Sequence, residues 1–230
     1  MTTHRFFVDP AVIAGERFAI PAEIERQVRR VLRLRDGERI VLLAGDGYER
    51  ECRLDGGDCV VEEHRAAGGE PRHRLTVAQA LLKGDGLETV VRQGTEIGVA
   101  AFIPMLTERC VPRDLAPRRL DRLRVIAREA AEQSERGLVP TIADPVRFVD
   151  VVGPGLTILA ERGTRPGLVG LDPVPSTVVI GPEGGFTPGE LELASKAGAA
   201  LVSLGRRILR SESVAAAAAA VILSRTGDFG

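Results

Sequence analysis

A short apolar strand that runs directly into a glycine-rich loop and a capped helix constrains this chain more than any other feature. Residues 177–180 (TVVI) are followed by residues 181–186 (GPEGGF), which place three glycines within five positions. Glycine allows backbone N–H and C=O groups to approach a ligand closely. Residues 187–190 (TPGE) then have the pattern of a capping box with proline at the first helical position. Because α/β sheets bind ligands at the carboxyl ends of their parallel strands, this loop predicts a ligand site.

A second strand and loop repeat this arrangement near the C-terminus. Residues 201–204 are a predicted strand, residues 205–209 a loop, and Ser211 a predicted N-cap of the final helix. Two neighbouring loops at one sheet edge suit a flat ligand such as adenine. Neither loop has the glycine pattern that binds triphosphates or dinucleotides, which disfavours those ligands. From the residues alone, a tight connection without any ligand remains the alternative for the glycine loop.

The rest of the chain predicts two domains. Glycine turns at residues 45–47 and 56–57 separate predicted strands at 39–43, 48–54 and 58–62, after a short strand at 6–8 and a helix over 21–32. Beyond a polar linker at 66–72, strands at 75–82, 101–106 and 156–160 alternate with helices at 87–97, ending at Gly98, and 117–135. We therefore expect a mostly β domain over residues 1–70 and an α/β domain with a parallel sheet over residues 71–230.

The charge and the cysteines limit the class of protein. A net charge of −1 argues against a protein that coats nucleic acid non-specifically. Only Lys83 and Lys196 are lysines among the 31 basic residues, and arginine suits phosphates and base edges better, although a codon bias explains the same excess. The three cysteines form no Cys-x-x-Cys pair, which favours a reduced, cytoplasmic protein without a zinc site. No apolar run is long enough for a transmembrane helix, and the first residues have no secretory signal pattern.

Several segments together resemble one known family. They are residues 5–8 (RFFV), 31–40 (VLRLRDGERI), 81–110 (LLKGDGLETVVRQGTEIGVAAFIPMLTERC), 128–140 (REAAEQSERGLVP), 180–191 (IGPEGGFTPGEL) and 203–220 (SLGRRILRSESVAAAAAA). In this order they resemble the RsmE family of ribosomal RNA uridine-N3 methyltransferases, a branch of the SPOUT superfamily. The resemblance implies a PUA-like RNA-binding β-barrel over residues 1–70, a trefoil-knotted parallel-sheet domain over 71–230, and a homodimer. It also implies S-adenosylmethionine-dependent methylation of N3 of one uridine in small-subunit (16S) ribosomal RNA.

The resemblance also assigns the site residues. Methyl transfer to a ring nitrogen requires alignment of donor and acceptor, removal of the N3 proton and stabilisation of the anion, without a metal or a covalent nucleophile. Arg136 is a candidate for pairing with the methionine carboxylate, a phosphate or a uracil oxygen. Arg210 is a candidate for stabilising the uracil oxygens, and Glu212 or Glu132 for orienting Arg210 or taking the proton; an exposed Arg–Glu helix pair is the alternative. The expected cofactor residues are Leu159, Gly181, Glu183, Gly184, Gly185, Leu204, Gly205, Ile208 and Leu209.

Arginines of the first domain are the candidates for RNA docking. Arg29, Arg30, Arg33 and Arg35 cluster on the predicted helix and the turn after it, and Arg113 lies in the second arginine-rich stretch. A solvated helix face is the alternative, because both stretches also contain acids. The chain departs from the family pattern at Gln27-Val28 and Gln93, where histidine and lysine are usual, which weakens these assignments. Two other functions remain open: a SPOUT enzyme that methylates ribose 2′-oxygens of transfer or ribosomal RNA, and a catalytically silent RNA-binding or ribosome-assembly protein.

Overall fold

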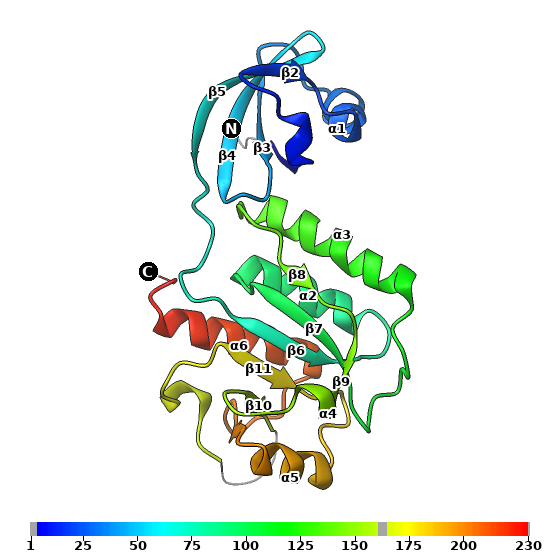
Figure 1. The fold of residues 1–230 in the computed structure, drawn as a ribbon, viewed down its shortest axis with the longest axis vertical. Coiled ribbons are helices and arrows are strands. Elements are labelled where there is room, and N and C mark those ends of the chain that lie inside the picture. Colours follow the sequence, from blue (N-terminus) through cyan, green and yellow to red (C-terminus); the bar gives the residue numbers. More distant parts are fainter. Residues whose placement is uncertain (1–3, 161–164, 230) are drawn as a thin grey trace. The chain divides into compact units, whose positions relative to one another are not determined.

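The computed structural model describes residues 4–160 and 165–229, and the chain divides into two compact units. The first unit contains Met1–Glu70 together with Ala131–Val139, and the second contains Pro71–Ala130 and Pro140–Gly230. The first unit therefore includes a later segment that the sequence placed in the second domain. Figure 1 follows the chain through both units.

The first unit is a five-stranded sheet in the order β1-β3-β4-β5-β2. Its strands are β1 (His4–Phe7), β2 (Arg17–Ala19), β3 (Arg39–Leu43), β4 (Tyr48–Asp55) and β5 (Asp58–Ala66). Strands β1 and β3 are parallel, and the other neighbours are antiparallel. The predicted turns are confirmed: Gly45, Gly47 and Gly56 all have positive φ angles of 62–81°, which favour glycine. The sequence missed β2 and the short 3₁₀ helix η1 (Pro10–Val12).

Both faces of β1 and β3 are buried, each in a different cluster. Alternate residues such as Phe6, Ile40 and Leu42 join the main core of this unit, which also buries Cys52 and Cys59. The opposite face, with Phe7, Val41 and Leu43, packs against Ala131 and the half-buried Val139. The later segment 131–139 thus covers a sheet face that water would otherwise reach, which explains why it belongs to this unit.

The helix predicted over residues 21–32 is only partly correct. The structure has a short α-helix, α1 (Ala22–Arg26), which continues as a single π-helical turn, η2 (Gln27–Val31). Arg33 then adopts φ of +57°, a left-handed conformation that is uncommon for a residue with a side chain. The wider π turn and this residue end the helix early, and they turn the chain toward β3.

The second unit is a parallel sheet in the order β12-β10-β11-β6-β7-β8, with β9 also paired to β7. The main strands are β6 (Thr76–Ala80), β7 (Ala101–Leu106), β10 (Thr157–Leu159), β11 (Thr177–Ile180) and β12 (Ala200–Val202). Two short strands that the sequence did not predict, β8 (Thr141–Ile142) and β9 (Val146–Arg147), both pair with β7 at the edge of the sheet. The expected parallel α/β domain is confirmed, and residues 177 to 180 are one of its central strands.

The helices of this unit are α2 (Gly86–Ile97), α4 (Phe148–Val151), α5 (Pro188–Lys196), α6 (Ser211–Arg225) and most of α3 (Pro117–Gln133), with a 3₁₀ turn η3 (Leu168–Gly170). Gly98 caps α2 with φ of +114°, as predicted. Helices α2 and α6 pack side by side on one face of the sheet (Figure 1). Among the described residues, no helix has both the length and the apolar character that a membrane span requires.

Candidate functional site

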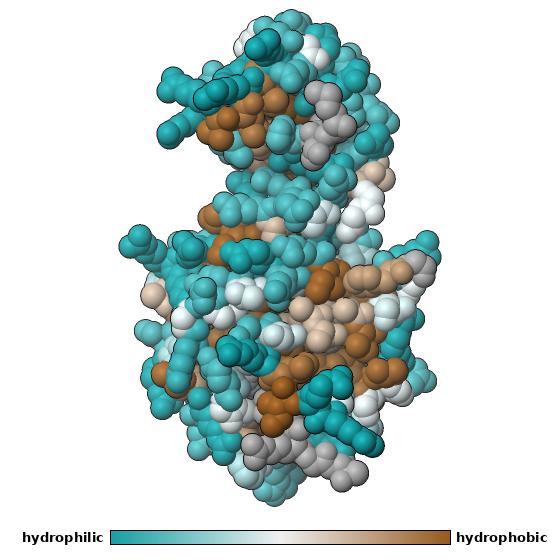
Figure 2. Space-filling model, turned by 180° about the vertical axis from the view of Figure 1, so that it is seen from behind, coloured by the Kyte–Doolittle hydropathy of each residue, from teal (hydrophilic) through white to brown (hydrophobic). Residues whose placement is uncertain are grey.

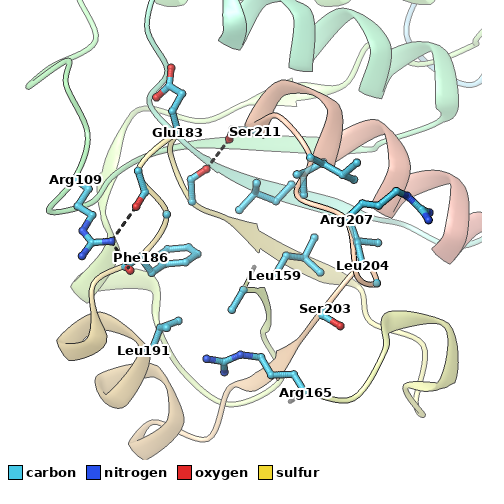
Figure 3. Close-up of a pocket in the computed structure, with 18 residues that line it drawn as sticks. Arg109, Leu159, Arg165, Glu183, Phe186, Leu191, Ser203, Leu204, Arg207 and Ser211 are labelled. Carbon is cyan, nitrogen blue, oxygen red and sulfur yellow. Dashed lines mark hydrogen bonds between the residues drawn. The ribbon is translucent and has the colours of Figure 1, made fainter. Parts of the chain in front are cut away.

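Three parallel strands end together at the edge of the second unit that holds the candidate site. Leu159, the last residue of β10, is in register with Ile180 of β11 and with Val202 of β12. The loops that follow these strands enclose a cavity of about 450 Å³ (Figure 3). This volume falls within the range of about 300–1,000 Å³ that is usual for small-molecule sites. The lining residues are Arg109, Leu159, Ala160, Arg165, Ile180, Gly181, Glu183, Gly184, Gly185, Phe186, Leu191, Ser203, Leu204, Gly205, Arg207, Leu209, Ser211 and Val214.

The glycine loop after β11 folds back over its own first residue. Gly185 has φ of +64°, and its N–H donates to the Pro182 carbonyl over 2.8 Å. A Cβ atom on Gly181 would lie 3.1 Å from the Phe186 ring, so this close approach favours glycine. The predicted capping box is confirmed, because the Thr187 hydroxyl accepts from the Glu190 N–H and the Glu190 carboxylate accepts from the Thr187 N–H. The loop is therefore fixed at both of its ends.

A buried hydrogen-bond network connects the glycine loop to the last helix. The Ser211 hydroxyl donates to the Gly181 carbonyl over 2.6 Å, and it accepts from Gln79 Nε2 over 3.1 Å. Gln79 Nε2 also donates to the Gly181 carbonyl over 3.3 Å. The prediction of Ser211 as an N-cap is wrong: Arg210 occupies the N-cap position of α6 and Ser211 is the first helical residue. The hydroxyl instead joins the first residue of α6 to the ends of β6 and β11.

Eight of the nine expected cofactor residues line this one cavity, and Ile208 does not, since it is 68% exposed. Glu183 lines the cavity, but its side chain points away from the hollow (Figure 3) and its Oε1 accepts from the Lys83 N–H over 2.9 Å. This carboxylate therefore ties the glycine loop to the turn between β6 and α2. We conclude that the two loops named from the sequence lie together at one site.

None of the three expected catalytic side chains lines the cavity. Arg210 and Glu212 flank the lining residue Ser211 without lining the cavity themselves; Arg210 has an 87% exposed side chain, with Nη1 3.8 Å from Glu212 Oε1. Arg136 belongs to the first unit and is buried, where Nη2 is 2.7 Å from Glu70 Oε2 and Nε is 3.1 Å from Oε1. Glu132 also belongs to that unit and accepts from the Phe7 N–H over 2.8 Å. Their catalytic roles remain predictions.

The arginines expected to bind RNA differ in their surroundings. Arg29 is engaged within the first unit, donating to Asp36 Oδ1 over 2.7 Å, to the Leu34 carbonyl over 3.0 Å, and to the Gly56 carbonyl. The side chains of Arg30, Arg33 and Arg35 are exposed, and none of the described residues forms a hydrogen bond or ion pair with them. In the second unit, Arg113 is exposed and its Nη1 lies 3.5 Å from the Glu108 carbonyl.

The sequence reasoning missed several residues of the cavity wall, of which Arg109, Arg165 and Arg207 carry charge. Two of these arginines could have been predicted from the sequence. Arg109 follows β7, and all the parallel strands of this sheet end at the same edge, so a side chain just beyond β7 was a candidate. Arg207 lies in the loop at residues 205–209 that the sequence predicted, although its side chain was given no role, whereas Arg165 lies in a loop that no periodic pattern places.

The lining of the cavity fits an adenosyl group. Leu159, Ile180 and Leu209 provide apolar surface for a flat ring. The backbone N–H groups of Leu204, Gly205 and Leu209 donate no hydrogen bond to any described residue, so they are available to ring nitrogens. Gly205, which lines the cavity, has φ of +106°, a conformation that strains residues with a side chain. Apolar walls with a few placed backbone donors are typical of cofactor sites.

Comparison with known proteins identifies the family. Residues 69–223 match the family described as RNA methyltransferase domain. The ribosomal RNA small subunit methyltransferase E of Synechocystis sp. is 35% identical in an alignment 233 positions long, which covers 95% of this chain and 77% of that protein. The chain belongs to this methyltransferase E family. The family member of the same name from Bacillus subtilis is 32% identical, over 91% of both chains. The resemblance noted in the sequence is therefore confirmed.

Two solved methyltransferase structures agree with this family. The enzyme of Neisseria gonorrhoeae, crystallised with bound S-adenosyl methionine, superposes with a TM-score of 0.85 at 29% identity, covering 97% of this chain and 98% of that one. A Legionella pneumophila methyltransferase with bound cofactor also gives 0.85, at 28% identity and 98% coverage of both chains. The fold is accordingly the knotted SPOUT type preceded by a small barrel-like domain, as the resemblance implied.

Proposed function

We propose that this protein transfers a methyl group from S-adenosylmethionine to N3 of a uridine in the RNA of the small ribosomal subunit. The observation that carries the proposal is the cavity at the ends of β10, β11 and β12, with its backbone donors and apolar walls. The cofactor-bound structure of the Neisseria gonorrhoeae relative supports the same ligand. S-adenosylmethionine supplies a methyl group on a positively charged sulfur, which is ready for in-line transfer to a nitrogen.

The chain's own residues would hold the cofactor and restrict its movement. In this proposal the N–H groups of Leu204, Gly205 and Leu209 bind the adenine edge, and Leu159 and Leu209 contact its faces. Gly181, Gly184 and Gly185 allow the glycine loop to approach closely, and the carboxylate of Glu183 holds that loop from outside through the Lys83 N–H. A preorganised loop lowers the entropy cost of binding.

Arg210 and Glu212 are the proposed catalytic pair for the uridine. Removal of the N3 proton leaves negative charge on the uracil oxygens, which a guanidinium next to the cavity stabilises. The exposed side chain of Arg210 has room to reach a substrate, and Glu212 lies close enough to orient it or to accept the proton. Arg136 is a further candidate, although its pairing with Glu70 gives it a structural role in the first unit. We expect Arg210→Ala to lose turnover at an unchanged unfolding midpoint, whereas the exposed Arg128→Ala on α3 retains both.

RNA is the proposed macromolecular partner, and Arg30, Arg33 and Arg35 are its proposed contacts in the first unit. These side chains have no acidic partner among the described residues, so their charge is available to phosphates. Arg29 instead fixes the turn that presents them, through Asp36 and the Leu34 carbonyl. Arg113 is a proposed contact in the second unit.

We further propose a cytoplasmic homodimer. One face of α6 carries the small apolar side chains of Ala216, Ala217, Ala220 and Val221, all partly exposed. Figure 2 shows tan and brown side chains gathered over this region of the second unit. A helix of low polarity at the surface favours burial against a second copy. Light scattering should give twice the mass of 24.6 kDa, and Ala217→Glu should reduce it to the mass of one chain.

The function is tested by methylating small subunits taken from a strain that lacks this gene. The subunits are incubated with the protein and labelled S-adenosylmethionine, and the nucleosides are separated by mass spectrometry. Labelled 3-methyluridine supports the proposal. A labelled 2′-O-methyl nucleoside would instead assign the chain to a ribose methyltransferase. No transfer, together with no cofactor binding in calorimetry, would identify a silent RNA-binding protein.

A further inference from the structure

The turn after β7 holds the glycine loop by its carbonyl groups. Arg109 Nη1 donates to the Gly184 carbonyl over 2.9 Å and to the Phe186 carbonyl over 3.3 Å (Figure 3). The loop continues from β11, while Arg109 continues from β7, and β6 lies between these two strands in the sheet. Arg109 therefore reaches across the end of β6 to bind the loop that follows β11.

The preceding residue, Glu108, makes a second connection to the same loop. Its N–H donates to Glu190 Oε1 over 2.8 Å, and its Oε2 accepts from the Thr187 hydroxyl over 3.0 Å. Glu190 and Thr187 are also the two residues of the capping box. Glu108 and Arg109, which we call the β7 latch, thus bind the glycine loop from Gly184 to the first turn of α5.

The turn that carries the β7 latch is itself fixed. The Cys110 N–H donates to the Thr107 carbonyl over 3.2 Å, and the Thr107 N–H lies 3.4 Å from Cys110 Sγ, with both side chains buried. The aliphatic stem of Arg109 also packs against Gly184, where an added Cβ atom would lie 3.3 Å from Arg109 Cβ. The turn and the packed stem therefore restrict the positions that the Arg109 guanidinium can adopt.

We infer that Arg109 is a positioning residue, which sets the conformation of the glycine loop in which the loop binds the cofactor. Adjacent glycines have wide conformational freedom, and ordering them on binding costs free energy. The Gly184 carbonyl and the Gly185 N–H belong to one planar peptide group, so a bond to the carbonyl also fixes the direction of that N–H. The bond to the Phe186 carbonyl likewise holds the segment whose ring forms a wall of the cavity. Arg109 thereby lowers this cost before the cofactor binds.

The inference rests on the proposed function for the identity of the ligand, but not for the ordering of the loop. Hydrogen exchange of the Gly184 and Gly185 amides, measured without cofactor, reports on the loop alone. We expect exchange at these amides to be faster in Arg109→Ala than in the wild type. Arg122→Ala, which removes an exposed arginine of α3, is the matched control and should leave exchange unchanged.

Calorimetry with S-adenosylmethionine tests the consequence for binding. Loss of hydrogen bonds from a charged donor predicts a Kd raised about tenfold or more in Arg109→Ala, with Arg109→Lys recovering part of the loss through its single ammonium group. At saturating cofactor kcat should be retained, while KM for the cofactor rises with Kd. Equal exchange and equal Kd in Arg109→Ala and the wild type would overturn the inference, as would a fall in the unfolding midpoint that Arg109→Lys does not reverse. If the wild type bound no cofactor while exchange still responded to Arg109→Ala, the proposed function would fail and the loop-positioning role would stand.

Discussion

Removing the Ser211 hydroxyl is expected to destabilise the second unit and to weaken cofactor binding. Ser211 is 4% exposed, and its hydroxyl donates to the Gly181 carbonyl and accepts from Gln79 Nε2. Ser211→Ala deletes both hydrogen bonds, each with a net value of about 1 kcal/mol. The Gly181 carbonyl keeps the longer bond from Gln79, so no full desolvation penalty applies there. The predicted loss is about 2 kcal/mol, or a fall of about 4–8 °C in the unfolding midpoint.

Thermal unfolding of three variants measures this effect. Ser213→Ala removes an exposed hydroxyl in the same helical turn, so it controls for helix propensity and should unfold like the wild type. Ser211→Thr keeps a hydroxyl at the position and should recover part of the stability. Because Gly181 begins the glycine loop, the Kd for S-adenosylmethionine should rise in Ser211→Ala alone. Equal midpoints for Ser211→Ala and Ser213→Ala would refute the assignment of stability to this network.

Three further predictions follow from the structure. Gly184→Ala should weaken cofactor binding at nearly unchanged stability, because its Cβ atom meets the Arg109 stem, whereas Gly153→Ala meets no atom within 4 Å and should bind normally in the same titration. Charge reversal at Arg30 and Arg33 should weaken RNA binding and lower the slope of log affinity against log salt by about 0.7–0.9 for each arginine that pairs with a phosphate; an unchanged slope would exclude both from phosphate binding. Burial raises the pKa of the Glu49 carboxyl, but hydrogen bonds from Arg5 and Arg65 outweigh burial and hold that pKa below its ordinary value of 4.5. The ionised Glu49 carboxylate therefore stabilises the folded state above pH 4.5, and this contribution is lost as the pH falls through the lowered pKa. The free energy of unfolding, measured in urea, should accordingly fall less between pH 7 and pH 3 in Glu49→Gln than in the wild type.

Features that depend on neighbouring residues were predictable from the sequence. The strand at residues 177–180, the capping box at Thr187 and the left-handed cap at Gly98 each follow from a few consecutive side chains, and all three are confirmed. The meeting of the two candidate cofactor loops at one cavity was predictable, because parallel strands bring their carboxyl ends to one edge. The ligand itself came from the family resemblance, since backbone donors and apolar walls suit many flat molecules.

Features that depend on distant residues were not predictable. Arg29, a predicted RNA contact, donates in the folded unit to the carbonyl of Gly56, which lies 27 positions later. Serine is a common N-cap residue, yet the Ser211 hydroxyl donates to the carbonyl of Gly181, 30 residues earlier in the chain. Arg136 lies in a motif that resembled a catalytic segment, and Glu70 pairs with it across 66 positions. In each case one hydrogen-bond partner lies far along the chain, outside the segment on which the prediction was based, and the RNA-binding and catalytic roles of Arg29 and Arg136 stay predictions.

The discontinuity of the first unit sets an order for folding during synthesis. Its sheet is complete in sequence once Ala66 has been made, but Ala131, which covers Phe7, Val41 and Leu43, follows only much later. Until then these apolar side chains lie open to water or to other proteins on the ribosome. A fragment ending at Glu70 would keep that face uncovered permanently. The native first unit therefore forms only after more than half of the chain has been translated, when the second unit still lacks β10, β11, β12 and α6.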